Sequence, residues 1–290
     1  MSKIDTFINT ASINDKLFLT EIATIENGIE VKIKIELYDK KNTLLGTHED
    51  TTIVESEKIR YPKEEEKTFK ICDITKKLPI EHKYITKMIS FIDINHDDIL
   101  EESESTTLNI KKQEMKFSQK GIDLLKSIEE LHLKVYDDQT GKDIEEYNDE
   151  NERGVTIGYG HLISEEEQTI YKEQVSITRT QADKLFLDDL QKFLKIVNET
   201  IKVNLLQQEY DALVILAFNI GTGVGSRNKG FKNSSVVKLI NDPKDAESNY
   251  PTLDEAWKAF NKSQGQVNKG IINRREAELK IFKEGVYEKW

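Results

Sequence analysis

The residues best suited to chemistry are two acidic pairs, Glu129–Glu130 and Asp137–Asp138, in the stretch IEELHLKVYDD. Two carboxylates across a gap can divide acid–base work. One keeps its proton for a leaving oxygen, and the other stays ionised and activates water or meets an anomeric carbon, as in glycoside hydrolysis. The alternative is a solvated acidic surface, because 53 acidic residues among 290 produce such spacings by chance.

The secondary structure predicted around these pairs favours a catalytic cleft over a solvated surface. SQKGIDLLKSIEE spaces its apolar residues three apart, as in an amphipathic helix, with Ser118 available as N-cap. Glu129 follows that apolar stripe at the helix end. LHLKVY then leads away as a short strand, and Asp138 falls where the chain turns back. A helix-end carboxylate facing one on a hairpin would form a cleft, although spacing alone does not choose within each pair.

The stretch GVTIGYGHLIS adds Thr156, Gly158, Gly160 and His161. The glycines suit a tight hairpin whose backbone passes close to a neighbour. A phosphate-binding loop is disfavoured, because neither a third glycine nor a P-loop lysine follows. We interpret His161 as a hydrogen-bonded structural histidine, not a ligand.

From Ser118 onward the sequence predicts a mainly helical domain with one strand-like excursion from Leu133 to Tyr159. ITRTQADKLFLDDLQKFLKIV has helical periodicity, with Thr180 as the expected N-cap. YDALVILAF is apolar on nearly every side, which predicts a buried central helix ending at Gly221. TLDEAWKAF and NRREAELKIF predict two more amphipathic helices.

Residues 1 to about 115 show the alternation of β-strands. EVKIKIELY places apolar and charged residues on opposite faces, and TLLG, TTIVES, KTFKICDI, YITKMISFI and TTLNI supply further short strands. The pattern predicts a small antiparallel sandwich. We place the boundary near KKQEMKF, which divides the chain into domains at 1–115 and 116–290.

One stretch of the first domain, FIDINHDDILEESE, resembles a calcium loop. Positions 1, 3, 5, 7 and 12 of an EF-hand-like pattern are Asp93, Asn95, Asp97, Ile99 and Glu104. The usual glycine at position 6 is replaced by Asp98, and the flanks predict strands in place of helices. Both a structural calcium site and an acidic turn without metal are open.

Composition excludes some partners. The net charge of −11 argues against nucleic acid and against electrostatic attraction to an anionic membrane. The single cysteine, Cys72, lies in an apolar run and is interpreted as a buried hydrophobe. Neither a signal peptide nor a transmembrane stretch is evident, so we expect synthesis in the cytoplasm, no general export and no membrane insertion.

The order of these blocks resembles the bacteriophage-type lysozymes, glycoside hydrolase family 24. The acidic pairs are followed by TIGYGHL, SITRTQADKLFLDDL, QQEYDALVILAFNIGTG and WKAF…GIINRREAELKIF, over about residues 118–285. The resemblance implies a mainly helical α+β domain with a small β-hairpin. It also implies a muramidase that cleaves the β-1,4 bond between N-acetylmuramic acid and N-acetylglucosamine with inversion and without a cofactor.

Carried over by position, the family's general acid falls on Glu129, not Glu130, because LKVYDD anchors the alignment. The same anchor puts the second carboxylate on Asp138, not Asp137. The resemblance further implies that Thr156 helps to hold the attacking water.

Two further residues are implied for substrate binding. Asn219 matches the polar residue that lines the cleft at the end of the buried helix. Arg274, or else Arg275, matches the arginine that pairs with the catalytic acid.

Two features depart from the family pattern. Glu130 stands where the family usually has glycine, and we expect it to point to solvent. Residues 139–155 are longer than the family's tight turn, and their polar composition predicts an extended hairpin tip or a flap.

The expected partner is peptidoglycan, with a delivery machine or an immunity protein as further possibilities. A β domain ahead of a muramidase suggests targeting or delivery, either in phage lysis or through a contractile, type VI-like injection machine into a rival's periplasm. Two alternatives stay open: a catalytically weak peptidoglycan-binding or structural protein of a phage tail or injection machine, and chitin-type cleavage by the same carboxylates.

Overall fold

The computed structural model describes residues 13–14, 16–17, 19–23, 30–53, 67–71, 84–93, 99–100, 105–109, 112, 114–138, 140–145, 147, 154–224, 230–263 and 265–290. The chain divides into two compact units, residues 1–113 with 203–206 and residues 114–202 with 207–290. The domain limits expected from the sequence, 1–115 and 116–290, stay a prediction. In the described residues no helix is long and apolar enough to cross a bilayer.

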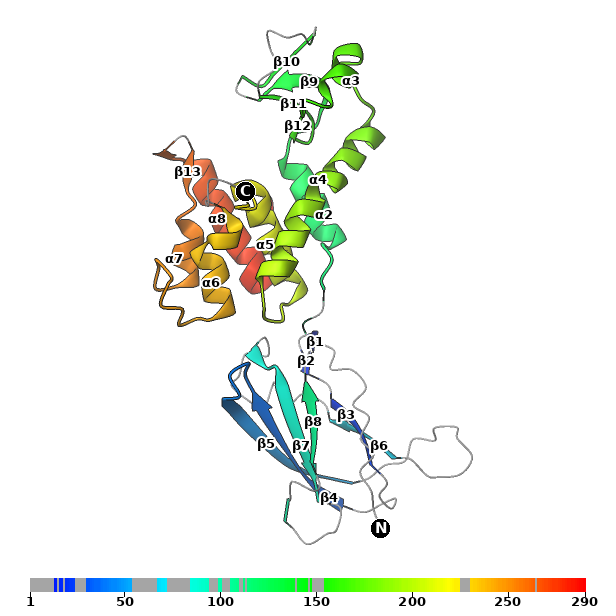
Figure 1. Cartoon of the computed structure of the whole chain (residues 1–290), viewed down its shortest axis with the longest axis vertical. Helices are drawn as coiled ribbons and strands as arrows, with labels where there is room; N and C mark the ends of the chain where they lie inside the picture. Colours follow the sequence, from blue (N-terminus) through cyan, green and yellow to red (C-terminus); the bar gives the residue numbers. More distant parts are fainter. Residues whose placement is uncertain are drawn as a thin grey trace, which may run out of the picture. The chain divides into compact units, whose positions relative to one another are not determined.

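The first unit contains a four-stranded antiparallel sheet (Figure 1). Its strands, in spatial order, are β5 (Leu44–Ile53), β4 (Glu30–Tyr38), β7 (Lys87–Ile92) and β8 (Ser105–Asn109). Ile35 and Leu37 of β4 are fully buried, as the period of two predicts. Two shorter pairs are β1 (Ile13–Asn14) with β2 (Lys16–Leu17), and β3 (Leu19–Ala23) with β6 (Lys67–Ile71). The all-β character of the whole unit stays a prediction, and Cys72 lies outside the described residues.

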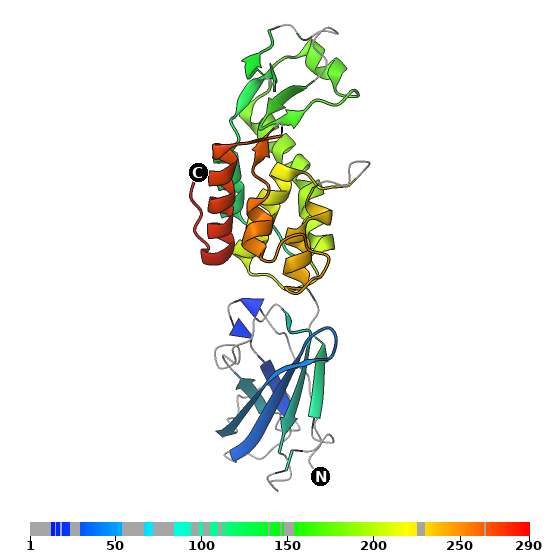
Figure 2. The ribbon, with the colours of Figure 1, turned by 90° about the vertical axis from the view of Figure 1, so that its left-hand side faces the viewer.

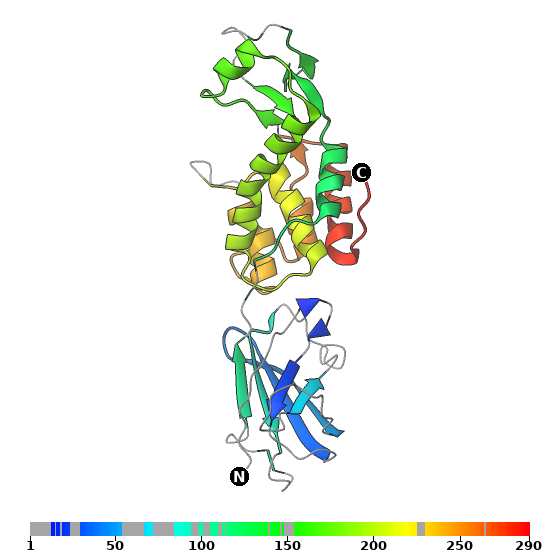
Figure 3. The same cartoon turned by 90° about the vertical axis from the view of Figure 1, so that its right-hand side faces the viewer.

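The second unit is mainly helical, which confirms the predicted α+β class for this part of the chain (Figure 2, Figure 3). Its helices are α2 (Gln119–Ile128), α3 (Gln168–Glu173), α4 (Arg179–Thr200), α5 (Gln207–Ile220), α6 (Ser235–Asn241), α7 (Leu253–Lys258) and α8 (Lys269–Glu284), with a 3-10 turn, η4 (Phe231–Asn233). A short hairpin joins β13 (Lys262–Ser263) to β14 (Gln266–Val267).

Helix α5 forms the centre of this unit. Every residue from Glu209 to Ala217 is buried, which confirms the predicted central helix. Helices α4, α8 and α2 pack around it. An amphipathic helix could not be covered on all sides in this way, because its polar face would be left without water.

A buried carboxylate on α5 fixes where α2 begins. Asp211 is fully buried and accepts hydrogen bonds from the Ser118 backbone N–H at 3.1 Å and from the Ser118 hydroxyl. Gln207 donates to it at 2.9 Å and the Tyr287 hydroxyl at 2.6 Å. Ser118 also accepts from the Gly121 N–H as the N-cap of α2, as predicted. The helix whose C-cap is Glu129 is therefore anchored at its N-cap.

Helix α4 begins earlier than predicted. Thr178, not Thr180, is its N-cap: the Thr178 hydroxyl accepts from the Gln181 N–H, and the Gln181 side chain accepts from the Thr178 N–H. This reciprocal capping box satisfies two backbone donors that a helix start would otherwise leave open. The prediction at Thr180 was wrong because Thr180 has no such partner three residues on; that position is Asp183.

The small sheet packs against the first half of α4 (Figure 1). Its spatial order is β10 (Lys142–Asp143), β9 (His132–Asp137), β11 (Val155–Gly158) and β12 (His161–Leu162), all antiparallel. The predicted extended hairpin is present as β10, which pairs with β9 after a turn at Gly141. Residues 148–153, where a flap was expected, lie outside the described residues.

His161 joins this sheet to α4. One ring nitrogen lies 2.8 Å from a carboxylate oxygen of Asp189 on α4, and the other lies 3.1 Å from Glu167. This confirms the interpretation of His161 as a hydrogen-bonded structural histidine. The hydrogen bond and charge of Asp189, helped by Glu167, raise the pKa of His161 above its ordinary value.

We predict that this contact makes stability depend on pH. A raised folded-state pKa means that the contribution is fully present below the ordinary pKa of histidine, about 6.5, and is lost as pH rises through the folded value. Asp189→Asn should therefore lower the free energy of unfolding by about 1.5–3 kcal/mol at pH 5.5 and by clearly less at pH 9, in urea titrations. If Asp189→Asn lowered the free energy of unfolding equally at both pH values, the contact of His161 with Asp189 would not be the source of the pH dependence.

Candidate active site

Glu129 lies where α2 stops. Its backbone N–H still donates to Leu125 at 3.0 Å, but its own φ and ψ of −75° and 120° take the chain out of the helix. Its side chain is 26% exposed and pairs with Arg274, Nη1 to Oε1, at 3.3 Å. The side chain of Glu130 is 92% exposed, as expected. The end of the helix thus separates the two neighbouring glutamates.

The second acidic pair sits at the turn that follows β9. The Asp137 carboxylate accepts the Thr140 backbone N–H at 2.9 Å, so it supports the turn. Asp138 is exposed, and its N–H donates to the Gly154 carbonyl at 3.0 Å. The backbone therefore fixes Asp138 beside the start of β11.

Thr156 lies on β11 directly opposite Tyr136 of β9. The threonine is 4% exposed, and its hydroxyl lies 3.4 Å from the Tyr136 carbonyl, at the long end of a hydrogen bond. Because opposed residues on paired strands point to the same face, their side chains are neighbours.

Tyr136 is a residue that sequence reasoning missed. Burial raises the pKa of its phenol, and the negative charges of Asp138 and Glu129 raise that pKa further, while Thr156 opposes the rise through a hydrogen bond. The phenol is thus within electrostatic reach of both predicted catalytic carboxylates. The signal was present in the sequence, because residues two apart on a strand share a face, and Tyr136 precedes Asp138 by two.

An irregularity in β9 brings a second ring against Tyr136. Thr156 of β11 pairs with Tyr136 of β9, and Gly158 pairs with His132. Four residues of β9 therefore lie opposite two residues of β11. Extra residues of this kind bend a strand and re-aim its side chains. The rings of His132 and Tyr136 stack with centroids 4.1 Å apart, and His132 also faces Asp143 at 3.6 Å.

Behind Glu129, α8 supplies two arginines and one buried carboxylate. Arg274 contacts Glu129 and also donates through Nε to Glu278 at 3.1 Å. Arg275 is fully buried, lies 3.0 Å from Glu278 and donates to Asn219. Burial lowers the pKa of Arg275 to about 10, and the charge of Glu278 opposes that decrease.

The two residues predicted for substrate binding thus have different partners. Arg274 pairs with Glu129, whereas the exposed side chain of Asn219 accepts from Arg275. Sequence reasoning missed Glu278, although its spacing of four and three residues from the arginines is that of helical ion pairs.

The calcium loop stays a prediction. Asp93 is buried and Ile99 is exposed, while residues 94–98 and 101–104, which include Asn95, Asp97 and Glu104, lie outside the described residues. Within the part of the chain that is described, no three His, Cys, Asp or Glu side chains gather as metal ligands.

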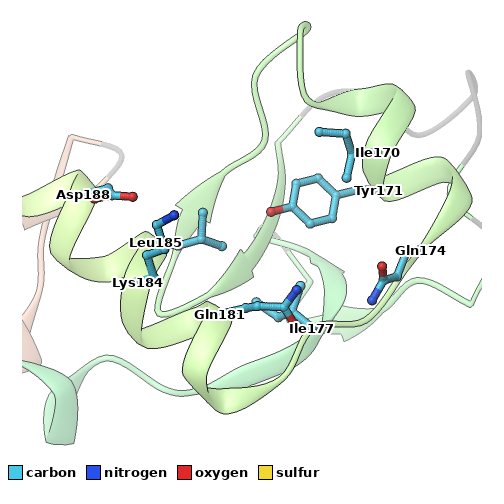
Figure 4. A pocket seen from close by; sticks show the side chains of 8 residues that line it. All are labelled: Ile170, Tyr171, Gln174, Ile177, Gln181, Lys184, Leu185 and Asp188. Atoms are coloured by element: carbon cyan, nitrogen blue, oxygen red, sulfur yellow. The ribbon is translucent and has the colours of Figure 1, made fainter.

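A pocket of about 220 Å³ lies elsewhere in this unit, between α3 and the first turns of α4 (Figure 4). Its lining is Ile170, Tyr171, Gln174, Ile177, Gln181, Lys184, Leu185 and Asp188. None of the predicted catalytic or substrate-binding residues is among them.

The fold and the site define an α+β protein with a central buried helix, a helix-end glutamate paired with an arginine, and a small sheet that presents an aspartate and a buried threonine. Residues 126–278 match the family model for phage lysozyme, and the chain belongs to that family.

Several similar proteins are endolysins. The endolysin of Bacillus phage PZA is 36% identical over 171 residues, covering 59% of this chain and 56% of that protein. The endolysin of Acyrthosiphon pisum secondary endosymbiont phage 1 is 30% identical over 172 residues, which cover 58% of this chain and 98% of that protein. A solved endolysin from Escherichia coli O157:H7 phage FAHEc1 is 30% identical, with a TM-score of 0.45. The match covers 61% of this chain and 99% of that protein. This chain spans about half the length of the Bacillus phage relative that it matches.

We predict that Arg275 stabilises the unit strongly. Arg275→Met leaves the buried carboxylate of Glu278 with less compensating charge, so the free energy of unfolding should fall by about 3–5 kcal/mol. Denaturation followed by tryptophan fluorescence reports on this unit, because both tryptophans, Trp257 and Trp290, lie in it.

The matched control is Glu276→Gln on the same helix. Glu276 pairs with Lys258 at 3.6 Å with both side chains at least half exposed, so its loss should cost no more than about 1 kcal/mol. Equal losses from the two variants would show that the buried pairing has no special weight.

Proposed function

We propose that this protein is a muramidase that hydrolyses the β-1,4 bond between N-acetylmuramic acid and N-acetylglucosamine in peptidoglycan. The observation that supports this best is the helix-end Glu129 held against Arg274, with a phenol within electrostatic reach of Glu129 and Asp138. Family membership and the endolysin relatives support the same substrate class.

In the proposed reaction Glu129 is the general acid. Its proton passes to the glycosidic oxygen as the bond to the anomeric carbon breaks, and the Arg274 guanidinium then stabilises the carboxylate that remains. Partial burial keeps this exchange close to the substrate oxygen and away from bulk water.

Asp138 is the proposed base. Its ionised carboxylate and the Thr156 hydroxyl hold a water molecule, which attacks the anomeric carbon from the opposite face and gives a proton to Asp138. The proton from Glu129 stays on the hydroxyl of the released sugar; Asp138 then loses its proton to solvent and Glu129 takes one up, which restores both groups. Tyr136 lines the same side of the sheet as Asp138 and Thr156 and supports their placement.

The first unit is the proposed targeting or delivery module. In this proposal the enzyme reaches the wall either during phage lysis or by loading into an injection machine. Co-purification with tube or spike proteins supports the second route, and an intact phage lysis cassette around the gene contradicts it.

We predict that Glu129→Gln reduces hydrolysis of purified cell walls by about 10²–10⁴-fold, because the amide cannot donate a proton to the leaving oxygen. Turbidity loss measures the rate, and mass spectrometry of the released muropeptides identifies the bond and distinguishes chitin-type cleavage. Glu130→Gln is the control and should retain activity, since that side chain is 92% exposed. Full activity of Glu129→Gln would refute the assignment.

We further predict inversion at the anomeric carbon. Water attack from the face opposite the leaving group converts a β-linkage into an α-anomer. Early proton NMR spectra of the hydrolysate, taken before mutarotation, should show the α-anomer of the new reducing end first. A β-anomer appearing first would indicate a covalent intermediate on Asp138.

A further inference from the structure

Glu278 on α8 is a carboxylate with no exposed surface. Its Oε1 accepts from Arg274 Nε at 3.1 Å, and its Oε2 accepts from the Trp257 indole N–H at 2.9 Å. Arg275 Nη1 lies 3.0 Å from Oε2. A buried charge is costly unless it is paired, and this one has two guanidinium groups and a donor from α7.

These neighbours identify the charge state of Glu278. Burial raises its pKa, and the two arginines and the indole oppose that rise. All three neighbours are hydrogen-bond donors, so a protonated carboxyl would have no acceptor among them for its own proton. The contacts therefore hold the ionised form.

The position of Arg274 links Glu278 to the site. The guanidinium is planar, so fixing its Nε on Glu278 also fixes the direction of Nη1, which lies 3.3 Å from Glu129. The side chain of Arg274 is only 9% exposed, and the Trp290 ring lies 5.0 Å from its guanidinium carbon. Arg274 and Glu278 are four residues apart on α8, a spacing that brings their side chains together on one face of the helix.

We propose that Glu278 is a positioning residue for glycosidic bond cleavage: it holds Arg274 against Glu129 and offsets the positive charge there, so that Glu129 retains its proton until the leaving oxygen takes it. This rests on the function proposed above. Glu278 itself touches no substrate atom in this scheme.

Charge balance explains why the reaction would need this carboxylate. The charged groups that these contacts bring together are Glu129, Arg274, Arg275 and Glu278. Their charges sum to zero when Glu129 is ionised and to +1 when it carries its proton, and without Glu278 the second sum would be +2. Trp257 and Asn219, which complete the cluster, are neutral. Without the charge of Glu278, two guanidinium groups would favour ionised Glu129, which cannot act as an acid.

The test is Glu278→Gln in the full chain, with wall hydrolysis measured against pH. The amide keeps the shape and an acceptor for the indole but loses the charge. We expect kcat at neutral pH to fall about tenfold or more with KM within about twofold. The basic limb of the profile, which reports the protonated acid, should move to lower pH by about 0.5–1 unit. An unmoved limb together with wild-type kcat overturns the proposal.

The matched control is Trp257→Phe, which removes a hydrogen bond to the same oxygen but no charge. It should lower stability and leave the basic limb in place. A limb that moves equally in both variants would indicate general loosening of the cluster and overturn the role assigned to charge.

A second variant decides the matter if Glu278→Gln does not fold. The double variant Arg275→Gln/Glu278→Gln removes opposite charges together, so no uncompensated buried charge is left. It should keep the basic limb near its wild-type position while kcat stays low, because Arg274 has lost its anchor. Wild-type kcat in the double variant overturns the positioning role.

A readout without turnover separates this proposal from the proposed function. Carbon-13 NMR of glutamate carboxyls, assigned with Glu129→Gln, follows the ionisation of Glu129 directly in the wild type and in the variants. A lower midpoint in Glu278→Gln supports the inference even if the substrate were another glycan. An unchanged midpoint overturns it while leaving muramidase activity intact.

Discussion

The buried pairing of one carboxylate with two guanidinium groups is the interaction on which the site depends. Through Glu278 and the arginines, α8 is tied to Trp257 of α7, to Asn219 of α5 and to Glu129 at the end of α2. Withdrawing Glu278 or either arginine from this cluster would leave a buried charge with less compensation. The cluster therefore holds four separate helices in one arrangement. The proposed acid, Glu129, lies at the end of one of them, α2.

The other half of the site is fixed by backbone register. Strand pairing sets Thr156 opposite Tyr136, and the irregular stretch of β9 stacks His132 on that phenol. One-residue slips would turn Thr156 away from Tyr136, because side chains alternate along a strand. The two halves thus rely on different physics: electrostatic pairing for Glu129, and strand geometry for Asp138 and Thr156.

The sequence was sufficient for the features that local patterns encode. Helical periodicity and the Ser118 cap place the end of α2, and all-round apolarity marks α5 as central. The start of α4 was misplaced by two residues, because choosing Thr178 over Thr180 required the partner Gln181 three residues on. The contacts of Trp257 and Asn219 with α8 and the irregular pairing of β9 with β11 join separate segments, and no short window contains them.

The network around Asp211 joins the two ends of the second unit. Ser118, which enters the unit, and Tyr287, near its exit, both bind that one α5 carboxylate. Both lie outside residues 126–278, the stretch shared with the family. The entry and exit segments of the unit therefore meet at one buried carboxylate, which closes the fold between them independently of what precedes Ser118.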